Sequence, residues 1–477
     1  MHPRPLALTT LLAAFLLLPS MASVGMFLDG LIYAAISRNL ADGVGTLWTP
    51  HFSAGLFPVF REHPPLVFWL QSAFFRLLGD SYLTERAYDL SLVVATALPL
   101  RALWRRLVDA AGRLELAGYW WLALLCWVLV PKWSWAYRSN VLENTMTLFC
   151  VGAVLLVLPA LRSDSHGRAL AWGLLAGGSM LLGFLAKGLP ALFVLVAPPW
   201  LALALRGVGP ARAGAVAVAM GVGAAGPFAL LLSSEPAARE LFGAWWQHQV
   251  AGRAGLQHGG AMLAELGKKV VPMIVVLLAA ALAVRRPVRS GWWRAVLAPA
   301  ASMLLIALSA SVPLVLGDRD SGHYLLPSLP FYALGFGLLA AGLLEAGGER
   351  IRSRLARRPG KVFIGAAAAA AVGIVVMCAG RVGEVRKNAA YHALFERVAA
   401  VTGPGATLAI GSDLYDDWLL HAVAQRYYRI DVVFGAPAAW RLVRSGDAAR
   451  DGGRTVTVGP WALERMPEPG RPDPEEP

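Results

Sequence analysis

Apolar side chains occur in long runs along most of the chain, separated by short polar segments rather than alternating with polar residues. About 20 apolar residues are needed for an α-helix to cross the hydrocarbon core of a membrane. The sequence therefore predicts an α-helical polytopic membrane protein with about 11 transmembrane helices. The predicted spans lie near residues 6–27, 84–104, 115–131, 141–161, 169–186, 188–205, 211–232, 270–285, 295–316, 325–344 and 362–380.

Composition agrees with a membrane protein. Hydrophobic residues make up 57% of the 477 residues and charged residues only 15%, whereas a soluble protein carries about 25% charged residues. The net charge of +13 comes largely from arginines in short segments between the spans, so it reflects membrane orientation and does not indicate nucleic-acid binding. Cys126, Cys150 and Cys378 lie within apolar runs, which argues against a disulfide framework or a cysteine metal cluster.

Basic residues cluster in alternate loops, and such loops face the cytoplasm. The N-terminus is therefore predicted to be cytoplasmic, with loops 28–83 and 233–269 and the tail from residue 381 on the outer side. In an alternative interpretation of the start, residues 6–23 form a cleaved signal peptide. Residue 29 lies outside in either case. The basic clusters are Arg101/Arg105/Arg106, Arg162/Arg168, Arg206/Arg212, Arg285/Arg286/Arg289/Arg294 and residues 350–361.

The two long outer loops carry structure of their own. Within loop 28–83, residues 31–40 and 66–78 are predicted to form short amphipathic or apolar helices that lie along the membrane interface. Loop 233–269 contains Trp245 and Trp246, and aromatic side chains concentrate at headgroup depth. Loops of this length usually have a function.

The tail differs in composition from the rest of the chain. Residues 406–410 and 430–434 are predicted strands, residues 416–428 a helix between them, and residues 455–458 a possible third strand. Residues 381–466 are therefore predicted to form a small soluble α/β domain, which the topology places in the periplasm. Residues 467–477 are predicted to be disordered.

The first outer loop contains two acidic residues, Asp29 and Glu62, close to predicted spans. Acidic groups at the mouth of a membrane protein tend to mark a functional site, because their desolvation is costly. The outer side also carries scattered cationic residues. The sequence therefore predicts acid–base chemistry on a substrate that arrives through the bilayer.

Several short segments in the predicted outer loops resemble a known family in the same order along the chain. The chain resembles GT-C-type glycosyltransferases of the protein O-mannosyltransferase superfamily, in particular the bacterial branch that includes the aminoarabinose lipid A transferase. The resemblance covers roughly residues 1–345, and Gly30 departs from it, since many relatives have a second acid there. The matching segments are Asp29-Gly30-Leu31-Ile32-Tyr33-Ala34, Glu62-His63-Pro64-Pro65-Leu66-Val67-Phe68-Trp69, Arg138–Asn144, Ala186-Lys187-Gly188, residues 246–258 and His323-Tyr324-Leu325-Leu326-Pro327.

The resemblance implies transfer of a sugar from a polyprenyl-phosphate carrier to a lipid, glycan or protein hydroxyl, with inversion at the anomeric carbon. It implies Asp29 as the base and Glu62 as a second carboxylate that orients the acceptor or the sugar. Cationic and aromatic side chains would bind the phosphate, sugar and prenyl carbons. These predicted substrate-binding residues are Tyr33, His63, Trp69, Arg138, Lys187, Arg253, His258, His323 and Tyr324.

Structural roles compete with these functional ones. Asp29 is also suited to capping the helix that begins near residue 31. Lys187 and Arg138 are also suited to anchoring the ends of spans at the headgroups. Glu143, about one turn inside a predicted span, is expected to pair with a neighbour rather than to react.

The predicted location is the inner membrane of a bacterium, with the site on the periplasmic face. No protein-bound cofactor is expected, although divalent metal dependence stays open, and no cluster of residues at metal-ligand spacing predicts a metal site. Two other classes compete. One is a non-catalytic membrane assembly or sugar-binding protein with the tail as its interaction module, against which the aromatic outer loops and the pair Asp29 and Glu62 argue. The other is a transporter or flippase of lipid-linked sugars. Such proteins usually have two repeated halves, and the sequence has no repeat of this kind.

Overall fold

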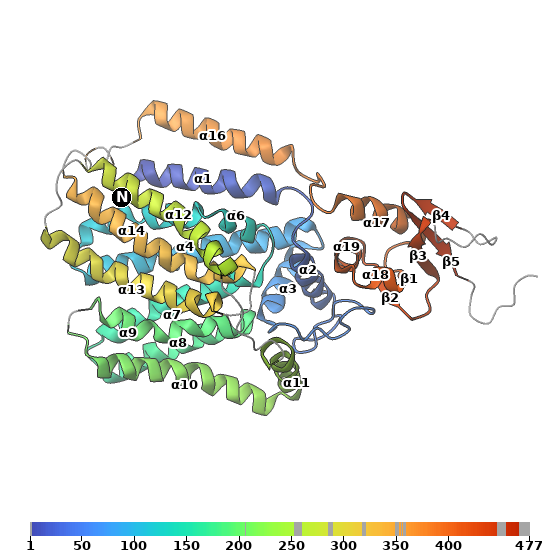
Figure 1. The fold of residues 1–477 in the computed structure, drawn as a ribbon, viewed down its shortest axis with the longest axis horizontal. Helices are drawn as coiled ribbons and strands as arrows, with labels where there is room; N and C mark the ends of the chain where they lie inside the picture. The colour runs from blue at the N-terminus through green and yellow to red at the C-terminus, as the bar shows by residue number, and fades with distance from the viewer. Residues whose placement is uncertain are drawn as a thin grey trace, which may run out of the picture. The chain divides into compact units, whose positions relative to one another are not determined.

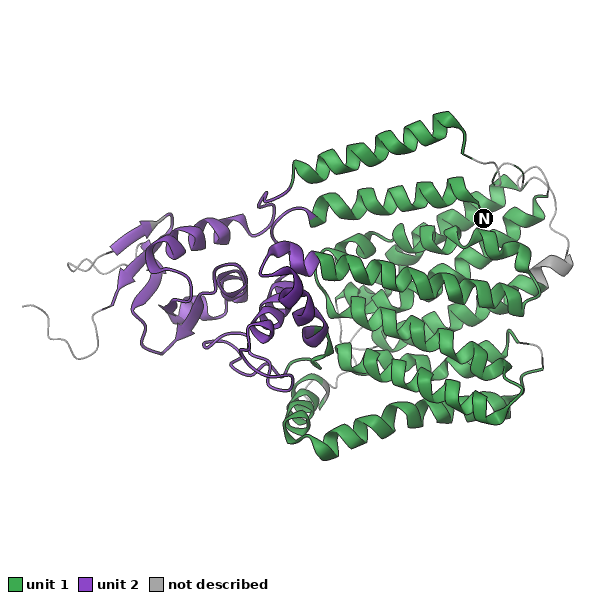
Figure 2. Cartoon of the chain, turned by 180° about the vertical axis from the view of Figure 1, so that it is seen from behind, with its two compact units in different colours: residues 1–21, 62–67, 87–381 green, residues 22–61, 68–86, 382–477 purple. Residues whose placement is uncertain are grey.

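The computed structural model describes residues 2–205, 207–251, 260–284, 290–316, 321–348, 353, 355, 359–445 and 455–466. The chain divides into two compact units (Figure 2). Unit 1 comprises residues 1–21, 62–67 and 87–381, and unit 2 comprises residues 22–61, 68–86 and 382–477. Most of the first predicted outer loop therefore belongs to the same unit as the tail.

Unit 1 is a bundle of long helices (Figure 1). The helix α4 begins in unit 2 and continues into unit 1. The helices of unit 1 are α1 (Pro3–Met21), α4 (Tyr82–Ala110), η1 (Leu114–Tyr119), α5 (Trp121–Val128), α6 (Pro131–Tyr137), α7 (Leu142–Arg162), α8 (His166–Lys187), η2 (Leu189–Val196), α9 (Ala197–Ala202), α10 (Pro210–Ser234), α11 (Pro236–Trp245), η3 (Trp246–Val250), α12 (Gly260–Ala283), α13 (Ser290–Val315), η5 (Gly322–Ser328), α14 (Leu329–Ala346) and α16 (Lys361–Ala379).

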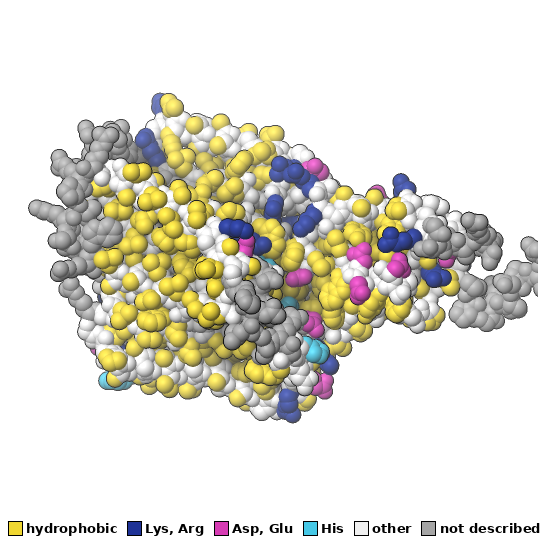
Figure 3. Space-filling view, viewed as in Figure 1, with side chains coloured by type: hydrophobic (Ala, Val, Ile, Leu, Met, Phe, Trp, Pro, Cys, Tyr) yellow, Lys and Arg dark blue, Asp and Glu magenta, His cyan; other side chains and the backbone are white. Residues whose placement is uncertain are grey.

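Eight helices in the described part of the chain are long and apolar enough to cross a membrane, or nine if the bent pair 114–128 and 131–137 counts as one span. The two other predicted spans also coincide with helices. Helix α4 has 29 residues, but its charged residues lower its hydropathy, and η2 with α9 covers only residues 189–202. Hydrophobic side chains cover much of the visible surface of these helices (Figure 3). The predicted polytopic membrane fold is confirmed.

Small residues allow the helices α8 and α10 to pack closely. A Cβ atom on Gly177 would overlap the carbonyl oxygen of Met220, and one on Gly223 would overlap the carbonyl oxygen of Leu174. In a bilayer, helices gain little from hydrophobic burial against each other, so close backbone packing at small residues contributes strongly to their association.

Unit 2 combines the first outer segment with the tail. It contains α2 (Leu28–Ala41), most of α3 (Leu66–Leu78), α17 (Ala389–Thr402), α18 (Ser412–Tyr415) and α19 (Trp418–Tyr428). Its strands are β1 (Thr407–Ile410), β2 (Asp431–Phe434), β3 (Trp440–Arg444), β4 (Thr455–Val458) and β5 (Trp461–Arg465).

The strands form one sheet in the order β2-β1-β3-β5-β4. The strand β1 pairs in parallel with both β2 and β3, and β5 pairs antiparallel with β3 and β4. The β1–α19–β2 unit matches the predicted βαβ arrangement, and β4 matches the possible third strand. The strands β3 and β5 were not predicted from the sequence.

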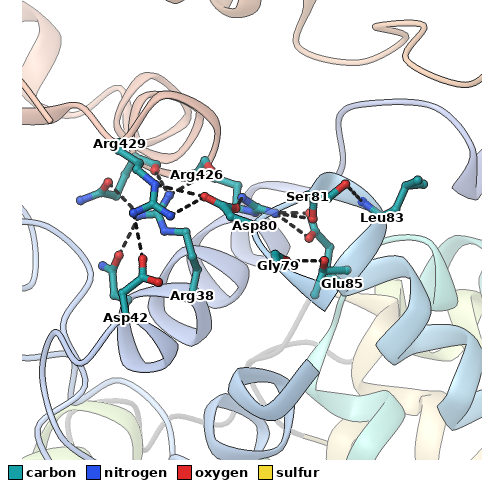
Figure 4. A network of polar contacts seen from close by, with 12 residues as sticks. Arg38, Asp42, Gly79, Asp80, Ser81, Leu83, Glu85, Arg426 and Arg429 are labelled. Atoms are coloured by element: carbon teal, nitrogen blue, oxygen red, sulfur yellow. Dashed lines mark hydrogen bonds and ion pairs between the residues drawn. The ribbon is translucent and has the colours of Figure 1, made fainter. Parts of the chain in front are cut away.

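A buried ionic network joins the two sequence segments of unit 2 (Figure 4). The Arg426 guanidinium lies 2.7 Å from Glu85 and 2.8 Å from Asp80, and the Arg426 and Glu85 side chains are 2% and 0% exposed. Arg38 donates hydrogen bonds to the backbone carbonyls of Gln425 and Arg426. Burial alone would raise the pKa of Asp80, but the charges of Arg426 and Arg38 outweigh it and lower the pKa.

Replacing Arg426 with Ala should destabilise α19 by about 3–5 kcal/mol, because it leaves the Glu85 carboxylate buried without its partner. The measurement is the free energy of local unfolding from hydrogen exchange of the α19 amides. The matched control is Arg444→Ala, which removes an exposed pair with Asp413 at 3.4 Å and should cost less than about 1 kcal/mol. Equal losses in the two variants would contradict the role of the buried network.

Acidification should destabilise the contact between α17 and α19. Burial lowers the pKa of His392 from 6.5 to about 4, where its ring packs on Tyr427 with centroids 4.5 Å apart. Between these pH values the unfolded segment binds a proton that the folded segment does not, so stability falls as the pH falls from about 6.5 to about 4. The measurement is the local unfolding free energy across this range.

The variant His392→Gln should flatten this pH dependence, because the amide does not titrate. The same substitution at His51, whose ring lies at an exposed site beside Pro58, is the matched control within unit 2. An unchanged slope in His392→Gln would show that other groups produce the acid sensitivity.

Candidate functional site

Unit 1 contains a cavity of about 160 Å³ at the ends of several helices. Three of the residues predicted for substrate binding, His63, Lys187 and Tyr324, lie in its wall, although they are far apart in the sequence. The cavity is lined by His63, Lys187, Leu189, Pro190, Trp245, Gln249, Leu314 and Tyr324. Its walls therefore combine a cation, a titratable ring, an amide and aromatic side chains.

A buried ion pair fixes the cation of the cavity. The Nζ atom of Lys187, the last residue of α8, lies 3.2 Å from Oε1 of Glu143 in the first turn of α7. The two side chains are 7% and 1% exposed. The contact is an ion pair and not an aligned hydrogen bond, since Oε1 has no hydrogen-bond partner of regular geometry. The expectation that Glu143 pairs with a neighbour is confirmed.

Gly188 determines how the chain leaves α8 beside Lys187. It is the C-cap residue with φ of 103°, a conformation that residues with a Cβ atom rarely adopt. A Cβ atom there would lie 2.5 Å from Cζ2 of Trp245. Glycine therefore allows the Trp245 ring to approach the backbone, and Trp245 lines the cavity together with Lys187.

The turn of η5 brings two aromatic rings to the same ion pair. Nε2 of His323 lies 3.7 Å from Oε1 of Glu143, and Nζ of Lys187 lies 5.4 Å from the centroid of the Tyr324 ring. The His323 ring stacks on Trp135, with 5.9 Å between their centroids. Glu143 therefore holds both a lysine and a histidine at this end of the bundle.

The Glu62 carboxylate lies next to the cavity. Its Oε2 accepts a hydrogen bond from Nε2 of Gln249, and its Oε1 lies 3.7 Å from Nδ1 of His248. Gln249 and His248 belong to η3, a π-helical turn, and such turns are frequent at functional sites. The Glu62 side chain is 26% exposed, so it is available to a ligand.

Polar contacts from α4 anchor the start of α7. The buried Asp89 carboxylate accepts hydrogen bonds from the backbone amide of Asn140, at 3.0 Å, and from the side-chain amide of Asn144, at 2.9 Å. Asn140 adopts a positive φ of 52°, which asparagine tolerates better than most residues. These contacts position the turn that carries Glu143. Asp89 was not predicted as a functional residue, although an acid inside a predicted span was a usable signal.

A second ion pair lies beside η5. Nζ of Lys269, a side chain 2% exposed, lies 2.8 Å from Oε2 of Glu265 on α12. A Cβ atom on Gly322 would lie 2.7 Å from this Nζ. Lys269 and Lys132 both act electrostatically on His323. Among the described residues, Lys187 and the Glu143 carboxylate also act electrostatically on His323.

Three predicted site residues belong to unit 2. Asp29 lies in the first turn of α2, whose N-cap residue is Phe27, so Asp29 does not occupy the N-cap position itself. Tyr33 is 3% exposed and packs on Phe60 and Phe68, with ring centroids 6.4 and 5.8 Å away.

Trp69 is the third of these residues. Its indole nitrogen donates to the carbonyl of Leu47 at 2.7 Å, and its ring meets Trp48 edge-on with 4.7 Å between centroids. The roles of Asp29, Tyr33 and Trp69 in binding or catalysis stay predictions.

The other predicted residues are placed as follows. Arg138 follows α6 and is exposed, and it does not line the cavity. Arg253 and His258 lie outside the described residues. Among the described residues, no group of three or more His, Cys, Asp or Glu side chains has the geometry of a metal site.

Replacing Lys187 with Met should destabilise the bundle by about 3–5 kcal/mol, because Glu143 is then buried without its partner. The double variant Lys187→Met/Glu143→Gln should recover most of this loss, since it buries no unpaired carboxylate. The measurement is the free energy of unfolding from titration with SDS. Arg113→Met, at an exposed pair with Glu115, is the control and should cost less than about 1 kcal/mol. Additive losses in the double variant would contradict the pairing.

Comparison with known proteins shows which fold this is. No protein-family model matches the sequence, and a search of curated protein sequences finds no match. The structure is similar to a crystal structure of ArnT from Cupriavidus metallidurans bound to undecaprenyl phosphate. The TM-score is 0.62 at 17% sequence identity, and the similarity covers 96% of this chain and 97% of that chain.

The same ArnT in the apo state gives a TM-score of 0.58 at 18% identity, over 95% of each chain. An oligosaccharyltransferase from Archaeoglobus fulgidus gives a TM-score of 0.46 at 13% identity, over 91% of this chain and 63% of that chain. The ArnT structures match almost the whole of both chains. The chain therefore has the GT-C-type membrane fold of ArnT, as its resemblance in sequence predicted.

Proposed function

We propose that the protein is a membrane glycosyltransferase that moves a sugar from a polyprenyl-phosphate carrier to a hydroxyl group of a lipid, glycan or protein. The observation that carries this proposal is the cavity around Lys187, where a buried cation lies beside a carboxylate, a histidine and aromatic rings. The ArnT structure with the same fold is bound to undecaprenyl phosphate, a lipid of the proposed donor class.

The cavity suits the headgroup of such a donor. Lys187 and His63 would bind phosphate oxygens through charge-assisted hydrogen bonds, which are stronger than neutral ones. Lys132, Lys187 and Lys269, which all act electrostatically on His323, would favour an anion there. At about 160 Å³, the cavity is smaller than pockets that enclose a whole drug-sized ligand. The prenyl chain would therefore remain in the bilayer.

In the proposed reaction, the acceptor oxygen attacks the anomeric carbon as the bond from that carbon to the phosphate oxygen breaks. The sugar is transferred with inversion, and the polyprenyl phosphate leaves with both electrons of the broken bond. A carboxylate takes the acceptor proton. By resemblance, Asp29 is the proposed base, and Glu62 orients the acceptor or the sugar. Tyr324 and Trp245 supply flat apolar surfaces on which a sugar ring packs.

The proposed orientation places the cavity on the periplasmic side of a bacterial inner membrane. Lys187 ends α8, whereas Arg162 and Arg168 lie at the opposite ends of α7 and α8. Arginine-rich ends of spans face the cytoplasm, which supports this orientation. Lipid A and other glycolipids, cell-wall glycans and proteins are the candidate acceptors, and a pentose or hexose is the candidate sugar.

The purified protein in liposomes should transfer radiolabelled sugar from a polyprenyl-phosphate sugar to an acceptor fraction or, more slowly, to water. Asp29→Asn and Glu62→Gln should each lower the turnover rate about 10²–10⁴-fold, the usual contribution of a positioned acid or base. Glu240→Gln, at an exposed position on α11, is the matched control and should leave turnover unchanged.

The competing function is movement of the intact lipid-linked sugar across the membrane. If the wild-type protein moved the lipid without releasing sugar, the transferase proposal would fail. Full activity in Asp29→Asn, with loss of activity in Glu62→Gln, would instead reassign the base.

A further inference from the structure

A second, larger cleft lies at the opposite ends of the same helices. It has a volume of about 440 Å³ and lies between the end of α4, the end of α7 and the start of α8. Its polar wall contains Arg106, Arg162 and Arg168, and its apolar wall contains Leu158, Pro159 and Trp172. The proposed transferase activity makes no use of this cleft.

The position of Arg106 follows from a proline in the neighbouring helix. Pro159 has no backbone N–H, so it cannot donate to the carbonyl of Leu155 one turn earlier in α7. That carbonyl accepts a hydrogen bond from Nη1 of Arg106 at 3.1 Å. The Arg106 side chain is thereby directed across the helix pair and into the wall of the cleft.

The charges of the cleft are unequal. Arg162 pairs with Asp109 at 2.8 Å, whereas Arg168 makes no ion pair among the described residues. The three arginines and two aspartates, Asp109 and Asp164, that line the cleft leave one surplus positive charge. Arg212 also donates to the carbonyl of Ser163, which holds the three-residue connection between α7 and α8 at the rim.

The cleft lies at the depth of lipid headgroups. Helix α7 has 21 residues, which corresponds to a length of about 30 Å and to the thickness of the hydrocarbon core. Its first turn carries Glu143 and its last residue is Arg162. The cleft and the Lys187 cavity therefore face opposite surfaces of the membrane. Trp172 is half-buried in the second turn of α8, a usual position for an interfacial indole.

We propose that this cleft binds the headgroup of an anionic phospholipid in the leaflet opposite to the Lys187 cavity. The arginine side chains would bind the phosphate diester, since guanidinium groups form paired hydrogen bonds with phosphate oxygens. Pro159 and Trp172, which are both half-buried in the lining, would contact the first carbons of the acyl chains. Basic pockets between transmembrane helices bind acidic lipid headgroups by this combination of contacts.

Orientation by positive loop charge is the competing explanation for these arginines. That effect depends on the number of charges near the ends of spans and not on their arrangement. It requires no cleft. It also requires no arginine whose side chain is held by a carbonyl group that a proline leaves without its helical hydrogen bond. Arg105, next to Arg106 in α4, is exposed and does not line the cleft. Its substitution therefore distinguishes the two explanations, because it removes a charge without changing the cleft.

The test measures lipid binding to the purified full-length protein in detergent by native mass spectrometry. The probes are dioleoyl phosphatidylglycerol, dioleoyl phosphatidylcholine and inorganic phosphate. The wild type should bind phosphatidylglycerol saturably and at least about 10-fold more tightly than phosphatidylcholine, since only its headgroup carries net negative charge. Arg106→Gln/Arg168→Gln should weaken phosphatidylglycerol binding at least about 10-fold, and Arg105→Gln should not weaken it.

Four outcomes would overturn the proposal. Equal weakening by Arg105→Gln would show that binding depends on diffuse charge, and equal binding of phosphatidylcholine would show that the headgroup charge is not recognised. Binding of inorganic phosphate that displaces phosphatidylglycerol would show a site for a free anion. If the double variant does not fold, Arg106→Lys/Arg168→Lys keeps the charge but loses the paired geometry. Unchanged lipid binding in that variant would also contradict the proposal.

Discussion

The buried ion pair between Lys187 and Glu143 is the contact on which the arrangement of the candidate site depends. It ties the end of α8 to the start of α7, and His323 lies within 3.7 Å of the same carboxylate. Burying two charges is costly unless both are well paired, so each residue constrains the position of the other. The cation that faces the cavity is thereby fixed without any contribution from a ligand.

Unit 2 is also stabilised by buried ion pairs, although its cation is an arginine and not a lysine. Arg426 is buried between Glu85 and Asp80, and Arg38 binds carbonyl groups near the end of α19. A segment from the first hundred residues is therefore joined to the tail by paired charges, which require more specific geometry than apolar packing. In both units, buried ion pairs hold together segments that are distant in the sequence.

The two ends of the bundle carry different sets of polar side chains. At one end, a lysine, a histidine, a glutamine and aromatic rings line the small cavity that we propose for a phosphorylated headgroup. At the other end, arginines from three helices line a wider cleft. The helices between them expose mainly apolar side chains (Figure 3). The proposed glycosyltransferase and lipid-binding roles would therefore use separate surfaces, and each can be tested without disturbing the other.

The sequence by itself determined the membrane class, most of the helix positions and the βαβ core of the tail, because apolar run length and local periodicity are properties of adjacent residues. It also predicted the pairing of Glu143. The partners of Glu143, the contact between Glu62 and Gln249, and the strands β3 and β5 depended on tertiary structure. The strands Trp440–Arg444 and Trp461–Arg465 are short and charged, and they gain their hydrogen bonds only from each other and from β1 and β4. The cavity likewise brings together residues that are more than a hundred positions apart in the sequence, namely His63, Lys187 and Tyr324. Their proximity depends on tertiary packing, and no local sequence pattern encodes it.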